Sequence, residues 1–181
     1  MIVEVGSLAE YYRLADRLRE RGFSEDQSAD APVCRWVSPP VRLDVMPTQP
    51  NVLGFGNAWY SPALESAQQV TLPSGKTVRL VTAAYFIATK FAAFESRGAD
   101  DYVMSHDLED IIAVVDGRQE IVTEVQAAEY ALRSFLASRF RRLLNEPRFV
   151  EAIPGFLPGD SASQARLPLL IDRIRSIAAL Q

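Results

Sequence analysis

Four charged residues in the second half of the chain are spaced so that they could form one polar cluster. Lys90 and Arg97 are seven residues apart, and Asp107 and Asp110 are three apart. Residues at these spacings share one face of a helix, so two cations on one helix could interlock with two carboxylates on the next. The pattern allows two interpretations. It predicts either an ion-pair network that fixes helix packing, or a cleft in which Lys90 or Arg97 binds a phosphate.

A further acidic residue lies inside an apolar stretch, VRLDVMPT, at 41–48. Because side chains alternate along a strand, Leu43 and Val45 would face one side of it, and Arg42 and Asp44 the other. A single carboxylate cannot supply the oxygen ligands that two divalent ions require. A catalytic role for Asp44 would therefore need acidic partners from elsewhere.

Histidine and cysteine each occur once. His106 precedes Asp107, but metal-dependent phosphohydrolase sites need several histidines, and adjacent helical residues point about 100° apart, which excludes a triad of Ser105, His106 and Asp107. We expect His106 to begin a helix, with substrate contact as the alternative. Cys34 has no partner for an intrachain disulfide and is expected to be a buried structural thiol.

The composition limits the class of protein. Hydrophobic residues make up 48% and charged residues 23%, as in ordinary globular proteins, and the net charge of −4 excludes a generally basic surface. One expected helix carries a local group of arginines, and two interpretations of it remain: a solvated helix face or a contact with RNA. These arginines are Arg133, Arg139, Arg141 and Arg142. No apolar run approaches the roughly 18 residues that cross a bilayer, and no signal peptide is evident. We expect a cytoplasmic protein without a membrane partner.

The elements that would position these residues change along the chain. Residues 1–81 predict a strand at 1–5, a helix capped by Ser7 and closed by Gly22, and two hairpins that turn at 38–40 and 74–75. Residues 82–181 predict helices at 82–96, 105–115, 120–142, 145–152 and 161–179. The expected fold class is α+β, with a small mixed β-sheet and helices at 1–81 followed by an α-helical half at 82–181.

Several stretches of the sequence resemble the bacterial nucleotidyltransferases related to the AbiEii-type toxins. They are LDVMP at 43–47, LGFGNAWY at 53–60, the segment 80–102 and SHDLEDIIAVVDGR at 105–118. The resemblance extends from Met1 to about Phe156. The set of Lys90, Phe94, Arg97, Asp107 and Asp110 is similar to the helical motif of that family, in which an Arg often stands at the position of His106.

The resemblance implies a metal centre that would be incomplete in these 181 residues. In the family, a mixed sheet holds three carboxylates that bind two Mg²⁺, and the ions align the phosphates of an NTP. Asp44 would be the third carboxylate and a metal ligand. The other two form an Asp-x-Asp strand that leads into a segment like IVEV, so we expect them to fall before Met1.

The helical motif would supply the rest of the site. The resemblance implies that Lys90, Arg97 and His106 contact the phosphates, with Lys90 also catalytic, while Asp107 and Asp110 form a structural polar cluster. We expect Lys90, Arg97 and the two aspartates to lie together and to face Asp44.

Two functions follow from these implications. One is a nucleotidyltransferase of toxin–antitoxin type that transfers a nucleotide from an NTP to RNA, such as tRNA, or to a protein, with weak or no activity in this chain. The other is a non-catalytic module that binds a nucleotide or a partner, either an antitoxin protein or a second copy through an exposed sheet edge.

Overall fold

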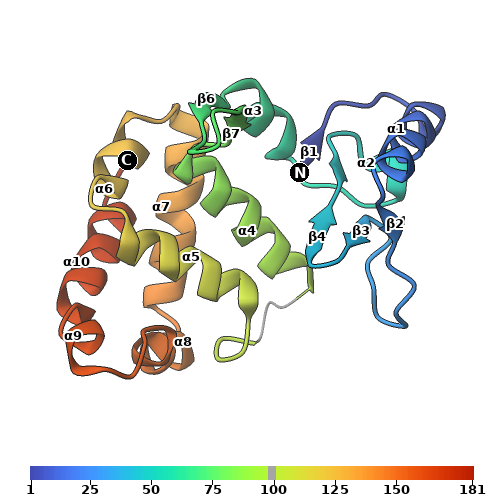
Figure 1. Cartoon of the computed structure of the whole chain (residues 1–181). Helices are drawn as coiled ribbons and strands as arrows, with labels where there is room; N and C mark the ends of the chain where they lie inside the picture. Colours follow the sequence, from blue (N-terminus) through green and yellow to red (C-terminus); the bar gives the residue numbers. More distant parts are fainter. Residues whose placement is uncertain (98–100) are drawn as a thin grey trace. The chain divides into compact units, whose positions relative to one another are not determined.

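The computed structural model describes residues 1–97 and 101–181, and the chain divides into two compact units, Met1–Ser66 and Ala67–Gln181 (Figure 1). Small sheets lie in the N-terminal part and helices dominate the C-terminal part, so the predicted α+β class is confirmed. The change from strands to helices falls near residue 81, as expected, since the last strand ends at Leu80 and the next helix begins at Ala83. The compact units divide earlier, after Ser66, so the second hairpin belongs to the helical unit and leads directly into its first helix.

The first unit holds two small sheets. In one, β1 (Ile2–Val3) pairs in parallel with β5 (Met46–Pro47). The other has the antiparallel order β2 (Ser24–Glu25), β3 (Arg35–Ser38) and β4 (Val41–Asp44). The hairpin of β3 and β4 was predicted from its short Ser-Pro-Pro break, and its register places Arg35 opposite Asp44.

Helix α1 (Leu8–Glu20) covers the core of this unit. Ser7 Oγ accepts a hydrogen bond from the Glu10 N–H at 3.3 Å, which confirms the predicted cap, and Gly22 follows the helix with the positive φ of 82° that favours glycine. Two short helices, α2 (Pro50–Leu53) and α3 (Tyr60–Glu65), complete the unit. The buried core consists of Val5, Tyr11, Ala15, Leu18, Trp36, Val45 and Val52.

Cys34 is buried in the same unit, as predicted for a structural thiol. Burial raises the pKa of its thiol, and the charge of Asp44 raises it further. Because the thiolate is the reactive form, both effects disfavour reaction at this residue.

The second unit begins with a hairpin and continues as helices. Strands β6 (Gln68–Thr71) and β7 (Thr77–Leu80) turn through Gly75, whose φ is 78°. The helices are α4 (Ala83–Arg97), α5 (His106–Gly117), α6 (Ile121–Ala127), α7 (Tyr130–Leu144), α8 (Pro147–Ala152), the 3-10 helix η1 (Ile153–Phe156), α9 (Ser161–Gln164) and α10 (Leu167–Ala178). Helix α4 packs against α5 and α7, and α10 packs against α7.

The single helix predicted at 120–142 is wrong, because it is broken into α6 and α7. Ala128 and Glu129 take extended ψ angles of 158° and 152°. Arg133 donates to the carbonyls of Gln126 and Ala128 at 3.0 and 3.1 Å, and the Tyr85 hydroxyl donates to Glu129 at 2.6 Å. The Arg133 bonds satisfy two carbonyls at the end of α6, and the Tyr85 bond holds the Glu129 side chain at the break.

The helix predicted at 161–179 is likewise two helices, α9 and α10. Pro168 lies in the first turn of α10, where its missing N–H costs no helical hydrogen bond. Within the described ranges, no helix combines the length and the apolar character needed to cross a membrane.

Candidate functional site

The predicted polar cluster forms between α4 and α5. Lys90 Nζ lies 3.3 Å from Asp107 Oδ1 and is also ion-paired with Asp110 Oδ2. Arg97 binds Asp107 through two hydrogen bonds, from Nε at 3.1 Å and from Nη2 at 3.0 Å. The expectation that these four side chains lie within ion-pair distance is therefore confirmed.

Burial is unequal within this cluster. The Asp107 side chain is only 7% exposed, whereas the Arg97 side chain is 68% exposed and Lys90 is partly buried. A buried carboxylate needs strong donors to compensate for lost hydration, and Asp107 obtains them from both cations. Asp107 is thus the fixed point that holds Lys90 and Arg97 beside each other at the surface.

His106 is the first residue of α5, as predicted, and Ser105 caps the helix by accepting from the Leu108 N–H at 3.4 Å. The imidazole is exposed and its Nδ1 lies 3.0 Å from Glu109 Oε2, one turn along the same helix. The structure thus pairs His106 with a neighbouring carboxylate on the outside of the helix. Its contact with a phosphate stays a prediction.

Asp44 is paired across the β3–β4 hairpin. Arg35 Nε donates to Oδ1 at 2.8 Å and Nη2 donates to Oδ2 at 3.1 Å, which is a bidentate ion pair. The hydrogen bonds that Arg35 donates to Asp44 raise the pKa of the Arg35 guanidinium above its ordinary value. The charge inside the strand therefore has a structural partner that our reading of the sequence missed. The predicted hairpin contained this information, because a register that pairs Ser38 with Val41 also places Arg35 opposite Asp44.

This pairing bears on the expected Mg²⁺ site. Both Asp44 oxygens already accept hydrogen bonds from Arg35. Over residues 1–97 and 101–181, no group of three or more His, Cys, Asp or Glu side chains is placed to hold a metal ion. The donor set does not fit the two-metal centre implied by the resemblance. Asp44 lies in the first unit and Lys90 in the second, and the expectation that they face each other stays a prediction.

We predict a modest stabilising role for the pair of Arg35 and Asp44. Cross-strand ion pairs contribute up to about 1 kcal/mol, and exposed pairs contribute less; the Asp44 side chain is 43% exposed. Asp44→Ala should therefore lower the free energy of unfolding by under about 1 kcal/mol, as measured by urea denaturation. In a double-mutant cycle with Arg35→Ala the two losses should be less than additive; simple additivity would contradict a direct interaction.

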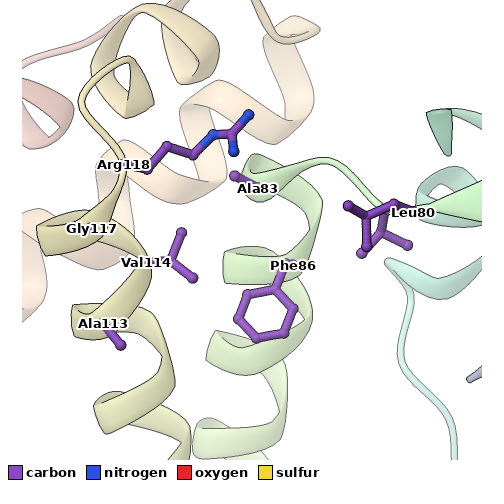
Figure 2. A pocket seen from close by; sticks show the side chains of 8 residues that line it. Leu80, Ala83, Phe86, Ala113, Val114, Gly117 and Arg118 are labelled. Carbon is purple, nitrogen blue, oxygen red and sulfur yellow. The ribbon is translucent and has the colours of Figure 1, made fainter. Parts of the chain in front are cut away.

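A cavity of about 290 Å³ lies at the other end of the contact between α4 and α5 (Figure 2). Its lining is apolar except for one cation, and comprises Leu80, Val81, Ala83, Phe86, Ala113, Val114, Gly117 and Arg118. Arg118 Nε donates to both carboxylate oxygens of Glu124, at 2.8 and 2.7 Å. Nothing in the sequence pattern marked this cavity, since it depends on how the hairpin and the two helices pack.

The arginines of α7 make contacts within the chain. Arg139 is ion-paired with Glu95 at 2.6 Å, and Arg141 donates to the Ala178 carbonyl at 2.8 Å. Arg133 donates to carbonyls at the end of α6. These contacts use the side chains to join helices, while a contact of the same helix with RNA stays a prediction.

The comparisons with known proteins return no relative: no protein-family model matches the chain, and neither a curated protein nor a solved structure matches it.

Proposed function

We propose that this chain is a nucleotidyltransferase-like protein of toxin–antitoxin type, in which Lys90 and Arg97 bind the phosphates of an NTP. The observation that carries the proposal is the buried carboxylate of Asp107, which holds both cations side by side at the surface of α4. The Arg97 side chain is 68% exposed, so this end of the cluster is open to a phosphate from solvent.

The donor capacity of the cations fits phosphate binding. A guanidinium carries five N–H donors, and Arg97 directs its Nε and one Nη2 donor at Asp107. The planar fork then presents further donors on its exposed side, a geometry that suits phosphate oxygens. Asp110 is 47% exposed, so it is the partner that Lys90 can exchange for a phosphate at the smallest cost, while buried Asp107 keeps the ammonium in place.

We propose that transfer of the nucleotide is weak or absent in this chain. Transfer in the family that it resembles uses carboxylates that bind two Mg²⁺, whereas both oxygens of Asp44 are held by Arg35. An RNA or protein acceptor, an antitoxin partner and dimerisation through a sheet edge are parts of this proposal that rest on the resemblance alone.

The proposal predicts that ATP with Mg²⁺ binds the chain through Lys90 and Arg97. Lys90→Ala and Arg97→Ala should each weaken binding about tenfold, because each removes a charge-assisted hydrogen bond to a phosphate. Titration calorimetry measures the dissociation constants. Lys76, the other lysine of the chain, is exposed in the turn between β6 and β7, so Lys76→Ala is the matched control and should leave the affinity unchanged.

Equal ATP affinity of Lys90→Ala, Lys76→Ala and the unaltered chain would overturn the phosphate site. Transfer is tested separately, as Mg²⁺-dependent incorporation of labelled NTP into bulk tRNA by the unaltered chain and by Asp44→Ala. Clear and equal incorporation by both would show that Asp44 takes no part in transfer.

A further inference from the structure

The apolar cavity and the polar cluster lie along one seam between α4 and α5. On α4, Ala83, Phe86, Lys90 and Arg97 are spaced three, four and seven residues apart, so they share a face. On α5, the order is reversed: Gly117 and Val114 line the cavity near the start of α4, while Asp110 and Asp107 meet the two cations further along. The seam therefore runs from an apolar end to a cationic end.

Phe86 joins the two ends of this seam. Its half-buried ring lines the cavity, and Figure 2 shows it on α4, with Val114 on the neighbouring helix α5. Lys90 Nζ lies 5.7 Å from the centroid of the same ring. The two residues are one helical turn apart, a rise of about 6 Å. A ligand that stacks on Phe86 thus has its next polar group within reach of Lys90.

The size and the lining of the cavity select the ligand group. A volume of about 290 Å³ is at the lower end of small-molecule sites, which span about 300–1,000 Å³. It suits a flat ring system better than a whole nucleotide. Bases stack on aromatic side chains with little preference among them. Arg118, the charged side chain among the described residues that line the cavity, is already bound by Glu124.

We infer that the cavity beside Phe86 is the base subsite of the nucleotide whose phosphates bind Lys90 and Arg97. The inference rests on the proposed function and deepens it. The base stacks on the Phe86 ring between α4 and α5, and the phosphates extend toward Lys90 and then Arg97. Because stacking dominates, the subsite accepts purines and pyrimidines with only small differences in affinity.

The test compares ATP with inorganic tripolyphosphate, each with Mg²⁺, by titration calorimetry on the full chain. Phe86→Leu keeps apolar volume but removes the ring, and Ala113→Leu narrows the cavity from an exposed helical position. Each should weaken ATP binding about tenfold, since each removes part of the stacking contact with the base, and leave tripolyphosphate binding unchanged. Ala131→Leu, the same change at an exposed position on α7, should alter neither.

The outcomes separate the two levels of the proposal. If both cavity variants bind ATP like the unaltered chain while Lys90→Ala weakens ATP and tripolyphosphate alike, the base subsite is refuted and the phosphate site stands. If the unaltered chain binds ATP no more tightly than tripolyphosphate, the base subsite is refuted as well. If Lys90→Ala changes neither affinity, the proposed function itself fails.

Discussion

Phe140→Ala is expected to lower the free energy of unfolding of the helical unit by about 3–5 kcal/mol, the usual cost of truncating a buried phenylalanine. Phe140 on α7 is fully buried, and its ring packs edge-on against that of Phe91 on α4, with centroids 5.0 Å apart. The substitution removes this aromatic contact and leaves a cavity between α4 and α7. Urea denaturation followed by the helical circular dichroism signal measures the loss.

Phe135→Ala is the matched control for this prediction. Phe135 lies on the same helix, but it is only half-buried, and the Arg139 guanidinium lies 4.5 Å from its ring centroid. An exposed cation–π contact contributes about 0.5–1 kcal/mol, so this variant should lose much less stability than Phe140→Ala. Equal losses in the two variants would contradict the assignment of Phe140 to the core between α4 and α7.

Elements whose signals are local could be predicted from the sequence. Ser7 with Glu10 marked the start of α1, Gly75 marked the turn of the second hairpin, and His106 was expected to begin the helix that is α5. The break between α6 and α7 could not be predicted in this way. No glycine or proline marks it, and it depends on a hydrogen bond from Tyr85, which lies 44 residues away from Glu129.

The same distinction between local signals and distant contacts explains which parts of the candidate site could be predicted. The cluster around Asp107 could be predicted, because helical spacing alone places Lys90 and Arg97 on one face. Predicting the pair of Asp44 and Arg35 required the register of the hairpin, and we assigned a role to Asp44 from the sequence without asking which residue lies opposite it. The cavity beside Phe86 needed the packing of a hairpin against two helices, which no single segment encodes.

Asp107 and Asp110 allow the structural and the functional interpretations of the cluster to be separated. Both aspartates lie on α5 and both bind Lys90, but Asp107 is 7% exposed and Asp110 is 47% exposed. Asp107→Ala should lower the free energy of unfolding by about 2 kcal/mol, because it removes the buried acceptor of charged hydrogen bonds. Asp110→Ala should cost less than about 1 kcal/mol, as expected for an exposed ion pair. Urea denaturation measures both losses, and equal values would contradict the anchoring role of Asp107.

The two variants should change nucleotide affinity in opposite directions, although both lower stability. Asp110→Ala removes a carboxylate that competes with phosphate for Lys90, so it should bind ATP more tightly than the unaltered chain by a few-fold, within the range of a partly screened charge contact. Asp107→Ala should bind ATP more weakly, because Lys90 and Arg97 lose the group that holds them together. A purely structural ion-pair network would show the stability difference without either change in affinity. The paired measurements on these two variants therefore distinguish a helix-packing device from a phosphate site.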